Sequence, residues 1–166
     1  MAMLEGLVAV FDSVSVPIPA KDGRPYREVF RYGAFAKVLS SGIDIPMTAE
    51  HDPYLVLGRL ADGTLRLWED YHGLRFEVEL PRREFGREVL KDIRSGLYRG
   101  GSIIFRRSNW QWIGVGGASV REIVEVGALS DVTICRSPSY TDTFVREMTP
   151  RLDAATARLR NVEASL

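Results

Sequence analysis

Apolar and polar residues alternate along several short stretches of the chain, and the clearest alternation runs through residues 73–80. Successive side chains of a strand point to opposite faces, so a period of two predicts a half-buried strand of an antiparallel sheet. Residues 64–68 alternate in the same way. We therefore expect these two stretches to form a hairpin across residues 69–72.

The period becomes helical in residues 82–95, where Phe85, Val89 and Ile93 recur at every fourth position among charged residues. This spacing places the three side chains on one face of an amphipathic helix. Gly96 follows directly and is expected to end the helix.

Short apolar or β-branched runs predict the remaining strands. They cover residues 4–11, 27–32, 43–50, 55–60, 102–105, 120–126 and 129–135. A short helix is expected over residues 33–39. Many short strands, few helices and no repeated strand–helix alternation indicate an α+β fold with mainly antiparallel strands, or a barrel.

The C-terminal segment predicts a further helix, because Thr149 suits the N-cap position and Pro150 the first helical position. Its apolar residues recur at intervals of three or four. Such a stripe suits docking on a partner or packing against the chain's own core. We expect one domain over residues 1–146 and a C-terminal helical tail over residues 147–166.

Composition narrows the possible partners of this 166-residue chain. Its 22 basic residues equal its 22 acidic residues, so no overall charge draws it to nucleic acid or to an anionic membrane. No apolar stretch is long enough to span a bilayer. Cys135, the only cysteine, lies in an apolar run, which predicts a buried thiol in a reducing compartment. We expect a soluble, cytoplasmic protein.

A candidate nucleophile stands at the start of one predicted strand, in the sequence Gly100-Gly101-Ser102. Glycines without a Cβ allow another backbone or a bound peptide to approach the serine. The same residues are also typical of a turn that leads into an ordinary strand. A chemical role for Ser102 therefore needs support from other residues.

Histidine is the natural general base near neutral pH, and the chain offers only His51 and His72. His72 falls at the tip of the predicted hairpin, where a solvated turn residue is expected. His51 ends an extended segment, from which its side chain could point into a cleft. A serine nucleophile would therefore take His51 as its base.

The base needs a third group that fixes its tautomer. Glu50 and Asp52 adjoin His51, but neighbouring side chains of an extended chain point to opposite faces. Asp131 opens an apolar strand and is our preferred acid, with Glu122 and Glu125 as alternatives. For the oxyanion donors, backbone N–H groups near Ser102 and the side chain of Arg136 are options.

Several short motifs, in this order, resemble the prohead (capsid maturation) serine proteases of tailed phages, which are related to the herpesvirus assemblins. The resemblance runs from about Gly6 to Val145. It rests on Gly-Leu-Val-Ala-Val-Phe at 6–11, Tyr-Gly-Ala-Phe at 32–35, Glu-His-Asp at 50–52, Leu-Gly-Arg at 57–59, Gly-Leu-Arg-Phe at 73–76, Ile-Arg-Ser-Gly-Leu at 93–97, Gly-Ser-Ile-Ile-Phe at 101–105 and Leu-Ser-Asp-Val-Thr-Ile at 129–134.

This resemblance implies an assemblin-like β-barrel flanked by helices, with Ser102 as nucleophile and His51 as base. The third residue is a histidine in the herpesvirus branch and usually an acid in the phage branch, often in a Glu-Val-Ser context. Here Asp131-Val132-Thr133 occupies those positions.

The implied function is a serine endopeptidase that uses acyl transfer, without cofactor or metal, inside the assembling procapsid in the host cytoplasm. Its implied partners are the phage capsid protein and scaffold, and its substrates include its own chain. The tail at 147–166 would dock on scaffold or be removed by self-processing, and self-association is left open.

Two other classes of function are weighed against this one. A non-catalytic procapsid assembly or scaffold-binding module could keep the same fold, although an intact serine, histidine and acid argue against it. A metal hydrolase would use His51 and His72, but two distant histidines and one cysteine form no recognisable zinc spacing.

Overall fold

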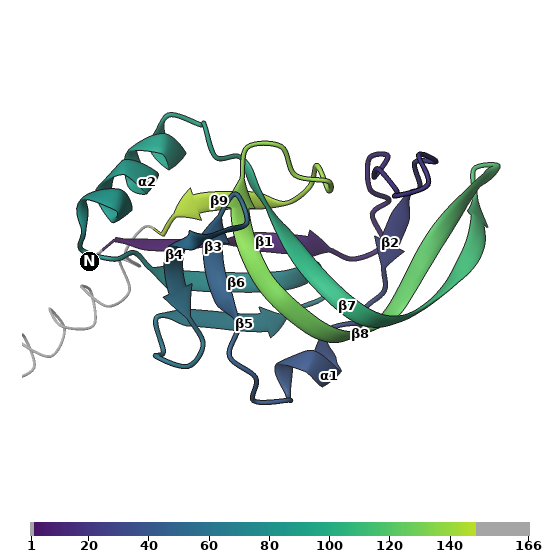
Figure 1. Ribbon diagram of the computed structural model, residues 1–166, viewed down its shortest axis with the longest axis horizontal. Coiled ribbons are helices and arrows are strands. Elements are labelled where there is room, and N and C mark those ends of the chain that lie inside the picture. Colours follow the sequence, from purple (N-terminus) through teal and green to yellow (C-terminus); the bar gives the residue numbers. More distant parts are fainter. Residues whose placement is uncertain (1, 149–166) are drawn as a thin grey trace, which may run out of the picture.

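The computed structural model describes residues 2–148, which form nine strands and two helices. Their bounds are β1 Met3–Val10, β2 Glu28–Phe30, α1 Ala36–Leu39, β3 Pro46–Ala49, β4 Asp52–Arg59, β5 Leu65–Glu69, β6 Gly73–Glu79, α2 Glu84–Arg94, β7 Gly100–Val115, β8 Ala118–Cys135 and β9 Phe144–Glu147 (Figure 1). The helical tail was predicted over residues 147–166, and residues 149–166 of it lie outside the described range.

The first sheet has four antiparallel strands in the order β5-β6-β1-β9. β5 and β6 pair from Leu65 opposite Val78 to Glu69 opposite Leu74, which confirms the predicted hairpin. The alternating apolar side chains of β6 face the core, because Leu74, Phe76 and Val78 have no exposed surface. This sheet supplies one wall of the hydrophobic core.

The second sheet is built around β8, an 18-residue strand. β2 and β3 pair parallel to different parts of one edge of β8, β4 pairs with β3, and β7 pairs antiparallel along the other edge. β7 and β8 form a long curved hairpin that extends beyond the rest of the molecule (Figure 1). The mainly antiparallel β architecture is thus confirmed.

The two strands expected at 120–126 and 129–135 are one strand, so that prediction was wrong. Gly127 interrupts the apolar pattern and suggests a break in the sequence. In the structure it stays inside the β7–β8 hairpin, where an added Cβ would lie 2.5 Å from the carbonyl oxygen of Arg107. Glycine therefore permits close contact between the two strands here.

The expected closed barrel is also not found among residues 2–148, because the two sheets remain open. They meet where β7 packs on β1, and a Cβ added to Gly101 would lie 2.7 Å from Val8 Cγ1. Val8 stands at an irregularity of β1, between the β6-paired residues Leu7 and Ala9. Close backbone packing, without a hydrogen-bonded ladder, joins the sheets at this point.

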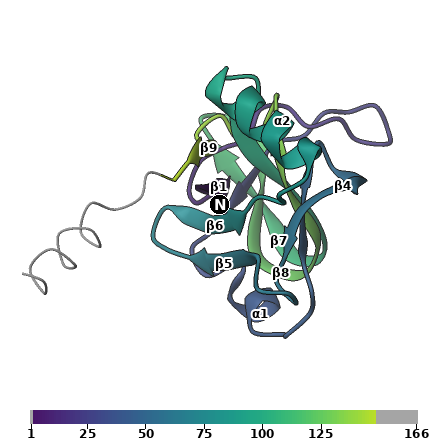
Figure 2. The same cartoon turned by 90° about the vertical axis from the view of Figure 1, so that its left-hand side faces the viewer.

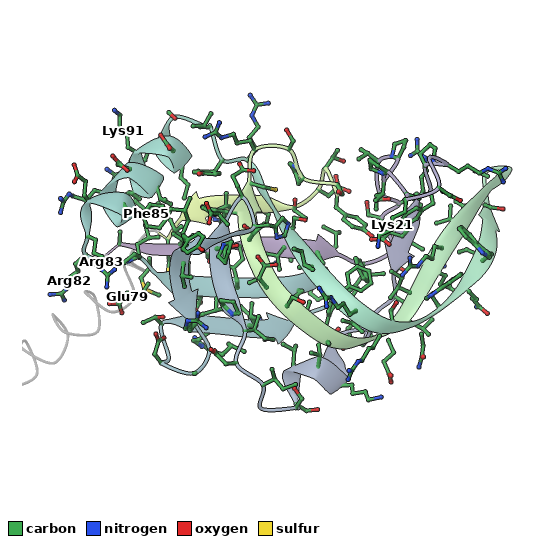
Figure 3. All side chains as sticks on the ribbon, in the orientation of Figure 1. Lys21, Glu79, Arg82, Arg83, Phe85 and Lys91 are labelled. Atoms are coloured by element: carbon green, nitrogen blue, oxygen red, sulfur yellow. The ribbon has the colours of Figure 1, made fainter. Side chains whose placement is uncertain are left out.

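The helices lie at opposite ends of the sheets (Figure 2). α2 buries Val89 and Ile93, and Gly96 after it has a φ of +76°, so the amphipathic helix and its glycine end are confirmed. Lys91 points outward from α2 (Figure 3). The short helix predicted near residues 33–39 is also confirmed as the single turn of α1.

Cys135 is buried at the end of β8 and forms no disulfide. Burial raises the pKa of its thiol to about 11. The prediction of a buried cysteine is therefore confirmed. Neither described helix is long and apolar enough to cross a membrane.

Candidate active site

Three hydroxyl side chains form a row across the adjacent strands β3, β8 and β7. Thr48 is paired in register with Thr133, and Thr133 is paired in register with Ser102. Paired residues point to the same face of a sheet, and neighbouring strands lie about 4.8 Å apart. Asp131 shares this face because it precedes Thr133 by two residues on β8.

His51 reaches this row from the corner between β3 and β4. Glu50 and His51 have φ values of +55° and +58°, so the chain turns sharply here and is not extended as the sequence suggested. The backbone N–H of His51 donates a hydrogen bond of 2.9 Å to Thr133 Oγ1. The imidazole is thereby held over the face that carries Asp131.

The acid and the base are in direct contact. His51 Nδ1 lies 3.0 Å from Oδ1 and 3.1 Å from Oδ2 of Asp131. The Asp131 side chain is 10% exposed and the His51 side chain 28%. A carboxylate in this position holds the proton on Nδ1 and leaves Nε2 to accept a proton.

Thr48 holds the Asp131 carboxylate in place through a hydrogen bond. Its Oγ1 donates a hydrogen bond of 2.8 Å to Asp131 Oδ2 and lies 2.9 Å from Thr133 Oγ1. All three residues are buried. Neither threonine was predicted from the sequence as a site residue. Polar residues at alternate positions within apolar strands were the available signal.

Ser102 is partly buried and lines a cavity of about 380 Å³. Its hydroxyl makes no hydrogen bond with any residue in 2–148, so the structure brings Asp131 to His51 but does not join His51 to Ser102 by a hydrogen bond. A Cβ at Gly100 would meet Thr143, and one at Gly101 would meet Val8. Both glycines therefore accommodate the chain's own packing.

The alternative acids have other partners. Glu122 pairs with Arg31 at 2.6 Å and accepts a hydrogen bond from Gln111. Glu125 pairs with Lys37 at 2.8 Å. Neither glutamate makes an interaction with His51 in the described chain.

The remaining candidates for the site lie apart from it or are already paired. His72 is exposed in the β5–β6 turn and its ring lies 4.1 Å from that of Tyr71. The N–H of Gly101 donates to Thr143 Oγ1, and the Arg136 side chain pairs with Glu50, with 3.5 Å between Nε and Oε1. Residues 2–148 contain no group of three or more His, Cys, Asp or Glu side chains placed to hold a metal ion.

The cavity beside Ser102 also contains buried ionisable groups. Burial raises the pKa of the Glu28 carboxyl, against the opposing effect of Arg121. Burial and the Glu28 charge raise the pKa of the Tyr140 phenol, which stays protonated. Glu28 and Tyr140 interact with each other, and this interaction contributes to both pKa shifts, although its geometry falls outside that of a regular hydrogen bond.

No curated protein matches the sequence significantly. Residues 1–158 match the family described as Caudovirus prohead serine protease. The match covers nearly the whole chain, including every strand and the His51–Asp131 pair. The chain therefore belongs to the Caudovirus prohead serine protease family and is a serine protease of phage capsid maturation.

Proposed function

We propose that the chain is an endopeptidase in which Ser102 is the nucleophile, His51 the general base and Asp131 the residue that orients His51. The observation that carries this proposal is the contact between His51 Nδ1 and Asp131, on the sheet face that also carries Ser102. A base oriented by a buried carboxylate beside a serine is the arrangement that activates a hydroxyl.

The reaction would proceed by acyl transfer. Ser102 Oγ attacks the carbonyl carbon of the scissile peptide bond while its proton passes to His51 Nε2. The imidazolium, stabilised by Asp131, returns that proton to the leaving amine, and an acyl-enzyme remains on Ser102. Water activated by His51 then releases the acid product. The Ser102–His51 hydrogen bond has to form on substrate binding, because catalytic contacts tighten in the substrate complex.

The substrates we propose are segments of the scaffold and of the capsid protein, together with the chain itself, cut within the assembling procapsid in the host cytoplasm. The family match supports this setting. The reaction as written needs no cofactor. A scaffold-docking or self-processed role for residues 147–166 is part of the proposal and concerns residues outside the described range.

Replacing Ser102 tests the assignment. The Ser102→Ala variant should lose cleavage of a co-expressed capsid or scaffold protein, by up to about 10⁶ in kcat. It should also lose labelling by a fluorophosphonate, whereas Ser119→Ala, on the exposed end of the hairpin, should keep both activities. Unchanged cleavage in Ser102→Ala would refute the nucleophile.

The identity of the acid is tested by comparing Asp131→Ala with Glu122→Ala and Glu125→Ala. We expect the large loss of activity only for Asp131, because Glu122 pairs with Arg31 and Glu125 with Lys37. A greater loss at either glutamate would move the orienting role to that residue.

A further inference from the structure

His51 stands on a corner of unusual backbone geometry. Glu50 and His51 have positive φ values of +55° and +58°, a region that residues other than glycine adopt uncommonly. Two consecutive residues of this kind keep their conformation only where surrounding contacts fix it. The contacts that hold this corner therefore decide where the imidazole of His51 lies.

Three hydrogen bonds tie the corner to the end of β8 and to the residue that follows it. The N–H of Glu50 donates to the carbonyl oxygen of Ile134 at 2.9 Å, and the N–H of His51 donates to Thr133 Oγ1 at 2.9 Å. The third bond runs in the other direction, from the N–H of Arg136 to Glu50 Oε1 at 3.0 Å. Of these three bonds, the third is the one that uses the Glu50 side chain.

Arg136 extends this connection toward the segment that carries Ser102. Its guanidinium pairs with Glu50, with 3.5 Å between Nε and Oε1, and lies 5.8 Å from the ring centre of Tyr98. Tyr98 is only 7% exposed, and it precedes Ser102 by four residues. Arg136 thus contacts both the corner that carries His51 and the segment that leads into β7.

The pair of Glu50 and Arg136 is too exposed to be a major source of stability. The Glu50 side chain is 41% exposed and the Arg136 side chain 56%. Exposed ion pairs contribute little to the free energy of unfolding, because water screens both charges. A hydrogen bond that fixes a corner still acts on geometry, and small displacements of a catalytic group have large effects on rate.

We propose that Glu50 is a positioning residue for His51. Its carboxylate holds the corner to the N–H of Arg136 and thereby keeps the imidazole where it can take the proton of Ser102. Asp131 contacts the imidazole directly, whereas Glu50 acts through the backbone. This inference rests on the proposed function, since it takes His51 as the base of Ser102.

Three substitutions of Glu50 separate its acceptor oxygen from its charge and from the backbone conformation. Glu50→Gln keeps an oxygen at the same reach, and Glu50→Ala removes it. Glu50→Asn tolerates a positive φ, but it is one methylene too short to reach the N–H of Arg136. We expect the rate of Ser102 labelling by a fluorophosphonate to fall about tenfold in Glu50→Ala and Glu50→Asn, and to stay within about twofold of native in Glu50→Gln.

Glu147→Ala is the matched control for the loss of an exposed ion pair. Glu147 accepts two hydrogen bonds of 2.8 Å from Arg94, and its side chain is 37% exposed in β9 of the other sheet. This variant should label at the native rate. Urea unfolding identifies conditions in which every variant is folded. A native rate in Glu50→Ala or Glu50→Asn, or an equal loss in Glu50→Gln and Glu50→Ala, would overturn the inference.

An NMR measurement tests the position of His51 without catalysis. In the Ser102→Ala protein, contact with Asp131 protects the proton on His51 Nδ1 from exchange with water. His72, the other histidine of the chain, is exposed and provides an internal reference. Adding Glu50→Ala should broaden the Nδ1–H signal of His51 at least about twofold, whereas adding Glu50→Gln should leave it sharp.

The two measurements separate this inference from the function on which it rests. A Nδ1–H signal of His51 that is unchanged by Glu50→Ala would overturn the positioning role. Labelling that persists in Ser102→Ala would instead refute the proposed function, whereas the NMR comparison reports on Glu50 alone.

Discussion

Thr48 offers a sharp test of how the site is held together. Thr48→Val keeps the shape of the side chain but removes the hydroxyl that donates to Asp131 Oδ2 at 2.8 Å and lies 2.9 Å from Thr133 Oγ1. The loss of one hydrogen bond to a carboxylate and one between hydroxyls amounts to about 2–4 kcal/mol of unfolding free energy. The variant should therefore unfold at a clearly lower urea concentration.

The same change should slow the chemistry, because Asp131 loses a contact that fixes its position against His51. We expect the rate of Ser102 labelling by a fluorophosphonate to fall about tenfold under conditions where the variant is still folded, since small misplacements of catalytic groups have large effects. Labelling by this probe needs no knowledge of the natural substrate.

Thr48→Ser is the matched control for both measurements. It retains the hydroxyl and loses one buried methyl group, which costs about 1 kcal/mol. Its labelling rate should stay close to that of the native chain. If Thr48→Val labels at the native rate and unfolds at the native midpoint, the role assigned to the threonine is wrong.

Three further predictions concern packing and ionisation. Gly101→Ala should lower the unfolding free energy by about 1–3 kcal/mol, because its Cβ would lie 2.7 Å from Val8 Cγ1, whereas Gly114→Ala has nothing within 4 Å and should be nearly neutral in thermal unfolding. With a thiol pKa of about 11, Cys135 should react with iodoacetamide at pH 8 about 100-fold more slowly in the native than in the unfolded chain, and equal rates would contradict its burial. The raised pKa of Glu28 means that the folded chain binds this proton more tightly than the unfolded chain, so the carboxyl destabilises the fold as pH rises above the ordinary value of 4.5. In urea unfolding, the stability of Glu28→Gln relative to the native chain should therefore increase between pH 4 and pH 7. If the difference in unfolding free energy between the two proteins does not change with pH, the pKa of Glu28 is not raised.

Local patterns predicted most elements of the fold. The period-two stretch at 73–80 and the period-four stretch at 82–95 each have one buried face, and such segments are specified by their own sequence. Gly127 was wrongly interpreted as a break between two strands. The strand is continuous there, and the glycine allows close contact with the facing strand. No local pattern contains that information.

The reactive groups of the candidate site could be proposed from the sequence, but the residues that hold them in place could not. With two histidines in the chain, reasoning about a general base led directly to His51. Thr48 and Thr133 were missed because their importance comes from strand pairing across more than 80 residues. The sharp turn at His51 was also missed, since a positive φ in a histidine leaves no mark in the sequence.

The long sequence separations in the site affect the order in which the chain can fold. β7 and β8 are joined by a tight turn and can pair early, whereas His51 and Asp131 are 80 residues apart and meet only after a large loop has closed. Closing large loops costs chain entropy that only later contacts offset, so such contacts tend to form late. We therefore expect the acid–base pair to be absent from the unfinished chain during synthesis. The protease would then gain its activity late in folding, and partly folded chains would lack the oriented base.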